Sequence, residues 1–150
     1  MSHAEETAMT ATEIDSCLGR HETGVLGLAR DDEPYAIPIS YGYDADERTV
    51  YLRLVSTPDS EKRRFLGSRP RARLVVYDRA ETEPIYRSAV AAGPLEELPP
   101  EELTVDHVEQ YGDAKRPLFE IWGEPTADLD IRLYELEPDE LSGRRVEIDR

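Results

Sequence analysis

The sequence contains no asparagine, and only two of its 18 basic residues are lysines, Lys62 and Lys115. It has 33 acidic residues, which give a formal net charge of -15 at pH 7. Sequence-independent binding to nucleic acid or to an anionic membrane requires a cationic surface that displaces counterions. We therefore expect a small-molecule partner, and neither a nucleic-acid partner nor a membrane partner. This halophilic composition is typical of a salt-rich cytoplasm, where salt screens the repulsion among carboxylates.

Cysteine and long apolar segments are also scarce. Cys17 is the only cysteine, so the chain cannot form an internal disulfide, and a reducing compartment is expected. No segment approaches the roughly 18 consecutive apolar residues of a membrane-spanning helix. Residues 1–11 are too acidic for a signal peptide. Together these absences predict a cytoplasmic protein.

Motifs for catalysis, phosphate binding and metal binding are missing. The chain has no Gly-x-Ser-x-Gly segment for a nucleophile and no Gly-x-Gly-x-x-Gly loop for phosphates. His3, His21 and His107 are isolated. Cys17 stands alone, so the sequence shows no paired metal-ligand spacing. We therefore predict no metal site, and the sequence assigns no catalytic residue.

The length of 150 residues suits one domain with a hydrophobic core. Residues 1–11 are small and acidic and show no periodicity, so we predict a disordered N-terminal tail there. The remaining residues, 12–150, are expected to form a single domain.

Short apolar segments separated by turn residues predict a mostly antiparallel barrel of six to seven strands. The expected strands are Gly24–Ala29, Pro34–Asp44, Arg48–Val55, Leu74–Tyr77, Ile85–Leu95 and Leu129–Leu133, with a brief ending at Arg145–Ile148 after a turn at Ser142 and Gly143. The expected helices run from Thr12 to Gly19, from Ser60 to Leu66, from Pro99 onward and from Pro117 to Trp122. This pattern is mainly β with short helices, an α+β fold class.

The segment Pro34–Asp44 alternates between a bulky face and a flat face. The bulky face carries Tyr35, Ile37, Ile39, Tyr41 and Tyr43, and the flat face carries Ala36, Pro38, Ser40 and Gly42. Pro38 has no amide proton to donate to a neighbouring strand, so we expect an edge or a bulge at that position. The flat face would let a planar ring lie against the backbone and form hydrogen bonds with it.

The twelve residues from Lys62 to Arg73 contain six basic residues and no acidic one. The basic positions are Lys62, Arg63, Arg64, Arg69, Arg71 and Arg73. Ser60, at the expected helix start, would add backbone amides and the positive end of the helix dipole. These features predict an anion site, and the alternative is that the cations pair with surrounding carboxylates. An anion site next to the flat face indicates a nucleotide-like cofactor.

Three segments together resemble a known family. They are Pro34–Tyr43 (PYAIPISYGY), Val50–Arg53 (VYLR) and Ser60–Arg63 (SEKR). Their order and spacing are similar to those of the FMN-binding split β-barrels of the pyridoxamine 5'-phosphate oxidase-like superfamily, in the small flavoprotein branch that includes nitroimidazole-resistance proteins. The resemblance covers residues 12–93. It implies an antiparallel split β-barrel that binds FMN at the interface of a homodimer.

The resemblance also implies a set of cofactor-binding residues. They are Pro38, Ile39, Ser40, Tyr41, Arg53, Ser56, Lys62 and Trp122. The backbone of Pro38–Tyr41 would lie along the isoalloxazine ring. Lys62 would bind the phosphate, with Ser56 and Arg53 beside it. Arg53 has an alternative role, a pair with an acid across the hairpin. Trp122 would cover the flavin from the partner subunit, or would be a core residue.

The activity implied by the resemblance is electron transfer between a reduced nicotinamide or deazaflavin and a small organic acceptor. The chain has Arg53 and Ser60 where nitroimidazole-resistance proteins usually have histidine and glycine. It also lacks the Arg-Leu-x-Pro-like ending of true pyridoxamine phosphate oxidases, so vitamin B6 oxidation is not implied.

Two other functions fit parts of the sequence. A non-catalytic carrier or sensor on the same fold could bind FAD, a deazaflavin coenzyme or haem in place of FMN. Haem would need an axial ligand, for which His21 and His107 are the candidates. An oligonucleotide-binding barrel would use aromatic residues interleaved with cations, but the net charge counts against it.

Overall fold

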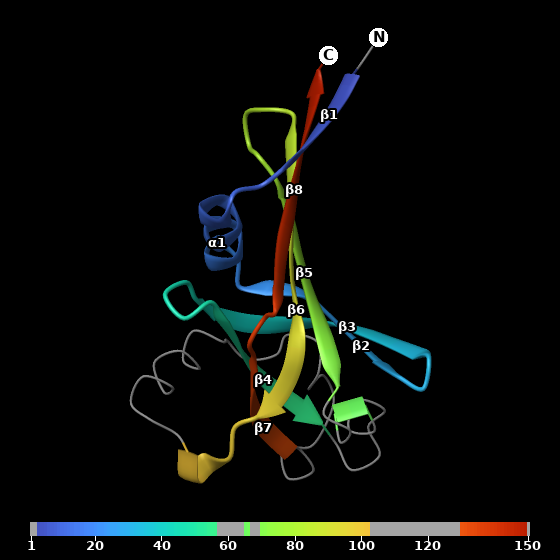
Figure 1. Ribbon diagram of the computed structural model, residues 1–150, viewed down its shortest axis with the longest axis vertical. Helices are drawn as coiled ribbons and strands as arrows, with labels where there is room; N and C mark the ends of the chain where they lie inside the picture. Colours follow the sequence, from blue (N-terminus) through green and yellow to red (C-terminus); the bar gives the residue numbers. More distant parts are fainter. Residues whose placement is uncertain (1–2, 57–64, 67–69, 103–129, 150) are drawn as a thin grey trace.

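The computed structural model describes residues 3–56, 65–66, 70–102 and 130–149 (Figure 1). Within these ranges the chain forms eight β-strands, the helix α1 and one short 3-10 helix. In chain order the elements are β1 (His3–Ala8), α1 (Ala11–Arg20), β2 (Thr23–Arg30), β3 (Glu33–Asp44), β4 (Thr49–Ser56), β5 (Arg71–Arg79), β6 (Ile85–Glu97), the 3-10 helix (Pro100–Glu102), β7 (Asp130–Leu136) and β8 (Glu140–Asp149). Among the described residues, no helix has the length and apolar character needed to cross a lipid bilayer.

Six of the strands close into an antiparallel barrel. Each pairs with the next in the order β6, β5, β2, β3, β4 and β7, and β7 returns to pair with β6. Strand β8 pairs with β6, and β1 pairs with β8, so these two strands extend the sheet beyond the barrel (Figure 1). The predicted fold class, an antiparallel split β-barrel with short helices, is confirmed.

The N-terminal segment and the C-terminal strand differ from the sequence predictions. We predicted residues 1–11 as a disordered tail, but His3–Ala8 forms β1 and pairs with β8 along its whole length. Strand β8 runs without a break through Ser142 and Gly143, where a turn was predicted. The described part of the chain therefore has eight strands instead of six or seven. The residues of β1 are small and acidic and carry no local signal for a strand. The strand forms because β8, from the opposite end of the sequence, pairs with it.

The barrel core is built by alternation along the strands. Alternate residues in the middle of β2, β4 and β5 contribute aliphatic side chains with at most 4% of their surface exposed, among them Leu26, Leu28, Leu52, Leu54, Leu74 and Val76. On β2 and β5 the residues between them are more exposed, as expected when successive side chains point to opposite faces of a sheet. The inner face of these strands is therefore apolar.

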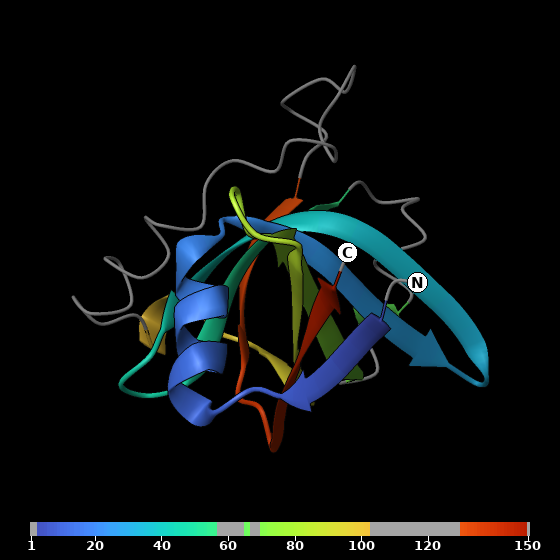
Figure 2. The ribbon, with the colours of Figure 1, turned by 90° about the horizontal axis from the view of Figure 1, so that it is seen from above.

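Helix α1 lies beside the sheet, as Figure 2 shows from above. The Thr10 side chain accepts a hydrogen bond from the Glu13 amide at 3.2 Å, and the Glu13 carboxylate accepts one from the Thr10 amide at 3.3 Å. This capping box places the N-cap at Thr10, two residues before the expected start of the helix at Thr12. Ile14, Cys17 and Leu18 form the buried face of the helix.

Two tyrosines of β3 fasten α1 to the barrel. The Tyr41 hydroxyl donates a hydrogen bond to the carbonyl oxygen of Leu18. The Tyr43 hydroxyl donates one to Oδ1 of Asp15 at 2.6 Å, and Oδ2 of the same carboxylate lies 3.4 Å from Arg48. Burial, reinforced by the hydrogen bond to Asp15, raises the pKa of Tyr43 well above the ordinary value of 10.0.

We expect the free energy of unfolding to fall as the pH rises above 10.0, the ordinary pKa of tyrosine. The folded state raises the pKa of Tyr43, and burial raises that of Tyr51 on β4 to about 12. The unfolded chain therefore releases protons that the folded protein retains, so this stabilisation is complete below the ordinary pKa and is lost above it. Urea midpoints measured on both sides of that pH test the prediction. Tyr43→Phe should have a lower urea midpoint than wild type at neutral pH, because it lacks the hydrogen bond to Asp15. Its midpoint should fall less than that of wild type as the pH rises above 10.0. An equal fall in both proteins would contradict the assignment of the pH effect to Tyr43.

Gly93 of β6 lies against the connection between β7 and β8. A Cβ at this position would lie 2.5 Å from the carbonyl oxygen of Glu137 and 3.0 Å from Cα of Pro138. Because both contacts are with backbone atoms, Gly93→Ala should lower the free energy of unfolding by about 1–3 kcal/mol.

Gly19→Ala in α1 is the matched control for this substitution. Nothing lies within 4 Å of a Cβ at Gly19, and alanine favours a helix over glycine by up to about 1 kcal/mol. Urea unfolding of the two variants should therefore move in opposite directions. Equal stability of the Gly93 and Gly19 variants would show that the close approach is not a constraint.

Candidate functional site

Strand β3 changes partner along its length. Glu33–Ser40 pairs with β2, whereas Tyr41–Asp44 pairs with β4. Beyond that point β4 continues to its end paired with β7. Strands β3 and β4 therefore diverge between Ser40 and Arg53, which would be the next positions of their ladder. We refer to this divergence as the β3–β4 fork.

The β3–β4 fork leaves one edge of β3 without a strand partner in the described part of the chain. The Tyr41 amide donates to the carbonyl oxygen of Glu22 at 2.9 Å, so odd-numbered residues of β3 direct their backbone groups toward β2. The even-numbered residues Pro34, Ala36 and Pro38 direct theirs toward the open edge. Because proline has no N–H, this edge is rich in carbonyl acceptors. The predicted edge at Pro38 is confirmed.

Within the predicted ring-binding segment Pro38–Tyr41, Pro38 is the one residue with an exposed side chain, and the other three are buried. Ile39 and Tyr41 point into the core and are only 2% and 1% exposed, so their backbone is the part that can face a ligand. Pro38 is exposed, Ser40 is buried, and Arg53 is half-buried on the opposite side of the fork. Arg53 follows Leu52, the register partner of Tyr41, so it lies one position beyond the end of the β3–β4 ladder.

The other predicted cofactor-binding residues lie farther along the chain. Ser56 is the last residue of β4, and Lys62 and Trp122 lie outside the described residues. Phe65, three residues after Lys62, is buried and stacks on Tyr35 of β3, with ring centroids 5.0 Å apart and planes inclined by 18°. This contact anchors the chain to β3 shortly after Lys62.

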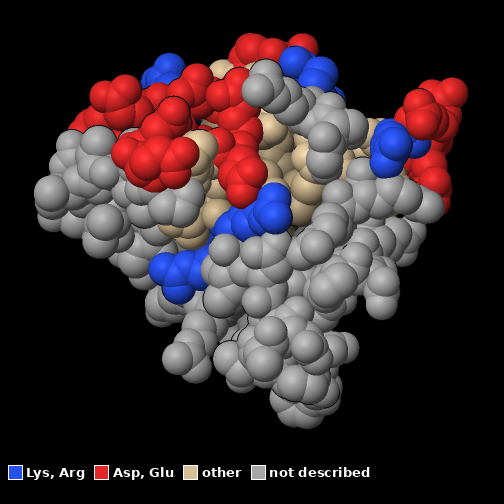
Figure 3. Space-filling view, turned by 90° about the horizontal axis from the view of Figure 1, so that it is seen from below, with Lys and Arg blue, Asp and Glu red and all other residues tan. Residues whose placement is uncertain are grey.

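The basic segment is described at Arg71 and Arg73 only. Two hydrogen bonds join Arg71 to Asp139, from NH1 to Oδ2 at 2.7 Å and from NH2 to Oδ1 at 2.8 Å. Pairing with a carboxylate, the alternative to an anion site, is therefore confirmed for Arg71. Arg73 is exposed and has no ion-pair partner among the described residues. On the face seen in Figure 3, acidic side chains cover more of the described surface than basic ones do.

The outer side of the sheet carries an apolar row that begins at the β3–β4 fork. Pro38, Val25, Val75 and Val90 are successive register partners across β3, β2, β5 and β6. Val25 is 37% exposed, and Tyr77, two residues beyond Val75 on β5, is 73% exposed. We refer to this row with Tyr77 as the outer sheet face. Contiguous exposed apolar side chains of this kind are typical of contact surfaces.

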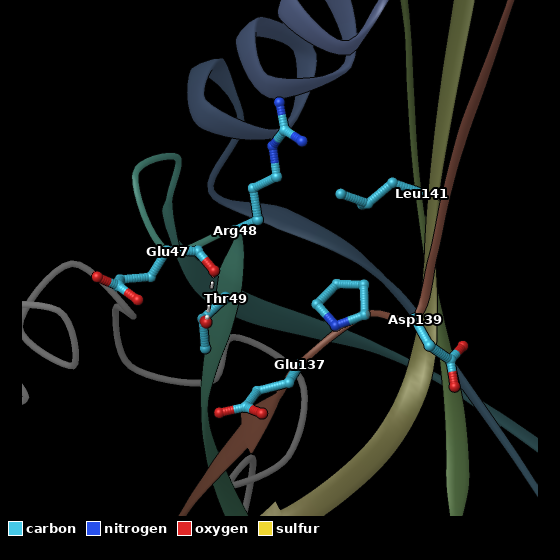
Figure 4. A pocket seen from close by; sticks show the side chains of 7 residues that line it. Glu47, Arg48, Thr49, Glu137, Asp139 and Leu141 are labelled. Atoms are coloured by element: carbon cyan, nitrogen blue, oxygen red, sulfur yellow. Dashed lines mark hydrogen bonds between the residues drawn. The ribbon is translucent and has the colours of Figure 1, made fainter.

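An open pocket of about 520 Å³ lies between the β3–β4 turn and the β7–β8 connection (Figure 4). Its lining is Glu47, Arg48, Thr49, Glu137, Pro138, Asp139 and Leu141. Arg48 points toward α1 and pairs with Asp15, and Asp139 pairs with Arg71, so Glu47 and Glu137 are the lining charges without an ion-pair partner among the described residues. Excess negative charge repels a phosphate, and the pocket lies at the start of β4 instead of at the fork. It is therefore not the predicted cofactor site.

A second polar cluster joins α1 to β5 and β6. The Asp78 carboxylate accepts a hydrogen bond from Nε of Arg87 at 2.8 Å and lies 2.7 Å from Nε2 of His21. Burial raises the pKa of Asp78, but the hydrogen bonds from His21 and Arg87 outweigh it and hold this pKa below its ordinary value. The thiol of Cys17 lies in the same cluster.

Sequence reasoning missed this cluster because it treated Cys17 and His21 as isolated. The available signal was their spacing of four residues at the end of one helix, which places two side chains on the same face. Asp78 is more than fifty residues away and is brought to them only by the fold.

Comparison with known proteins identifies a family. A model of the pyridoxamine 5'-phosphate oxidase family matches residues 10–145, which is most of the chain. A search of curated proteins found no match to the sequence.

The fold is similar to those of several solved structures, including the following three. An FAD-binding protein from Mesorhizobium loti has a TM-score of 0.72 at 21% identity, covering 97% of this chain and 99% of that chain. A protein from Bacteroides thetaiotaomicron, described as a candidate for 5-nitroimidazole antibiotic resistance, has a TM-score of 0.68 at 17% identity, covering 99% and 93%. An FAD- and haem-binding protein from Mycobacterium smegmatis has a TM-score of 0.62 at 19% identity, covering 92% and 71%. At these identities the similarity establishes the fold.

Proposed function

This chain belongs to the pyridoxamine 5'-phosphate oxidase family, and from this membership we propose that it is a cytoplasmic oxidoreductase that binds FMN. The reaction moves electrons between a reduced nicotinamide or deazaflavin and a small organic acceptor. FMN supplies the redox chemistry when bound, and the protein supplies binding, placement and exclusion of water. The observation that carries this proposal is the β3–β4 fork.

The β3–β4 fork fits a planar cofactor with a hydrogen-bonding edge. Pro38 and Ala36 are exposed and short, so a ring can approach the backbone of β3 closely at these positions. The carbonyl groups of the open edge can accept hydrogen bonds from N–H groups of an isoalloxazine ring. Because β4 has diverged at this point, no strand of the described chain competes for the same groups.

The phosphate in this proposal is held by Lys62, with Arg53 and Ser56 beside it. Arg53 lies at the fork, and Ser56 follows it at the end of β4. The stacking of Phe65 on Tyr35 holds the chain against β3 shortly after Lys62. Ammonium and guanidinium groups bind phosphate through charge-assisted hydrogen bonds. Arg53 also brings positive charge toward the ring, which stabilises negative charge gained on reduction.

A homodimer completes the proposed site, with a second copy of the chain covering the outer sheet face. This face is apolar and continuous with the open edge of β3. Arg73 and Arg79 lie on the same side of β5 as Val75, and their charges reduce the repulsion between two chains of net charge -15. The partner subunit's Trp122 lies over the flavin in this arrangement.

A non-catalytic carrier or sensor for flavin or haem is the second candidate. The observation in its favour is the fold shared with the Mycobacterium smegmatis protein, which is described as binding FAD and haem. Haem needs an axial ligand. His21 is held by Asp78 at 2.7 Å, and His107 lies outside the described residues. FAD and a deazaflavin coenzyme are the other cofactors that this candidate allows.

We expect protein purified in high salt to retain added FMN, and its visible absorption bands, after the excess is removed. Lys62→Ala should weaken FMN binding by about 10- to 150-fold, because a hydrogen bond to a charged group contributes about 1.5–3 kcal/mol. Lys115→Ala is the matched control, since Lys115 is the only other lysine and has no place in the proposed site. Calorimetric titration with FMN measures both affinities. An unchanged affinity in Lys62→Ala would overturn the phosphate assignment.

Turnover separates the oxidoreductase from the carrier in the same sample. Under anaerobic conditions a reduced nicotinamide or reduced deazaflavin should bleach the flavin bands, and a small organic acceptor should restore them. Retained flavin that no donor reduces would support the carrier. A protein that does not bind FMN but shows the absorption spectrum of bound haem after haem is added would support the haem-binding alternative.

Val25→Glu should convert the dimer to monomers and weaken FMN binding with it. The substitution places a charge in the outer sheet face, where burial against a second copy would desolvate it. Val25 is 37% exposed, so the folded subunit has room for the change. Ala45→Glu, in the exposed β3–β4 turn, is the matched control. Sedimentation velocity measures the assembly, and a monomeric wild-type chain or a dimeric Val25→Glu variant would contradict this interface.

A further inference from the structure

Three side chains of different chemistry converge where α1 meets β5. The sulfur of Cys17, an imidazole nitrogen of His21 and a carboxylate oxygen of Asp78 all lie within 4.8 Å of one another. We propose that this cluster is a binding site for a divalent transition metal such as Zn²⁺, separate from the flavin site. We refer to it as the Cys-His-Asp site.

The fold builds the Cys-His-Asp site from two elements. Cys17 lies in the last turns of α1, and His21, four residues later, is the C-cap residue of the same helix. Asp78 comes from β5, near the top of the β5–β6 hairpin. Cys17 is fully buried, whereas the side chains of His21 and Asp78 are 30% and 13% exposed. A metal ion can therefore enter from the His21 side, and a water molecule can complete its coordination.

The donor set selects for the proposed class of metal. A thiolate, an imidazole and a carboxylate are the three protein ligands that Zn²⁺ takes, at about 2.0–2.3 Å. Around a tetrahedral ion such bonds place neighbouring donor atoms roughly 3.5 Å apart. In the structure the three donor atoms lie within 4.8 Å of one another, so small side-chain movements would bring them to the separation that a bound ion requires. Hard ions such as Mg²⁺ and Ca²⁺ prefer oxygen ligands and should bind this site weakly, because only one of its three donors is an oxygen.

Arg87 orients the carboxylate ligand. Its Nε donates to Oδ1 of Asp78 at 2.8 Å, which leaves Oδ2 directed toward His21. A partner that holds the second oxygen of a ligating carboxylate is a common support of metal sites. Metal binding replaces the contact of 2.7 Å between Asp78 and His21, and the proton of the Cys17 thiol passes to solvent.

Arg20 opposes metal binding in this arrangement. Its NH2 lies 3.2 Å from Oδ2 of Asp78, so it occupies the oxygen that would face the ion. The side chain is 42% exposed and can move into solvent when an ion arrives. Removal of this cation should therefore strengthen metal binding. The competing view is that Asp78 only fastens α1 to the sheet through ion pairs, in which case no thiolate–metal bond forms.

The test is titration of the reduced, chelator-treated full-length protein with Co²⁺, which reports its ligands by absorption. We expect a thiolate-to-cobalt charge-transfer band and the visible bands of tetrahedral Co²⁺, measured as a difference against the same protein before addition. Zn²⁺ should abolish these bands by displacement and should raise the melting temperature through preferential binding to the folded state.

Four variants give the titration its specificity. Cys17→Ser should lose the charge-transfer band, and His21→Gln should weaken Co²⁺ binding by more than about tenfold, the cost of disturbing even a supporting group. Arg20→Gln should tighten binding by about two- to fivefold, the range of a partly exposed ion pair. Asp15→Asn is the matched control, because Asp15 also fastens α1 to the barrel but lies outside the site. It should leave the cobalt spectrum unchanged.

The proposal is overturned if wild-type protein gives no charge-transfer band, or if the band persists in Cys17→Ser. His21→Gln keeps the test decisive if the serine variant fails to fold, because His21 is partly exposed at the helix end. In that case an unchanged Co²⁺ affinity in His21→Gln also overturns it. FMN binding does not enter any of these readouts.

Discussion

The exchange of partners by β3 is the constraint on which the rest of the structure depends. One edge of this strand pairs with β2, and the other edge pairs with β4 only from Tyr41 onward. In the described part of the chain, β3 is therefore paired on both edges at one end and on a single edge at the other. Pro38 lies in the open part, where an ordinary residue would direct an N–H away from any strand partner. The proposed flavin site makes use of this edge of β3.

In this acidic chain, arginine side chains connect neighbouring elements through ion pairs. Arg48 joins the start of β4 to Asp15 of α1, Arg71 joins β5 to Asp139 beside β8, and Arg87 joins β6 to Asp78. Exposed pairs contribute at most about 1 kcal/mol each, so their value lies mainly in fixing geometry. The pair at Asp78 is less exposed and is screened less by solvent. Arg73 has no ion-pair partner among the residues that the structure describes.

The central strands could be predicted from the sequence almost completely. Strands β2 to β6 lie within a few residues of their expected bounds, because alternating apolar residues and turn residues are local signals. The expected disorder at His3–Ala8 and the expected turn at Ser142 were wrong for a shared reason. Strand β8 lies between β6 and β1, and pairing on both sides holds small and polar residues in an extended conformation. Neither neighbour is close to it in sequence.

The sequence by itself determined which face of each central strand is buried, and it restricted β3 to an edge or a bulge at Pro38. Period-two alternation and the missing proton of proline act within a single strand, so they can be read without knowing its neighbours. Only the tertiary structure decided where β3 leaves β4, that Arg71 is taken by Asp139, and that Asp78 meets Cys17 and His21. These contacts join residues far apart in the chain, and their energies exist only once the barrel has closed.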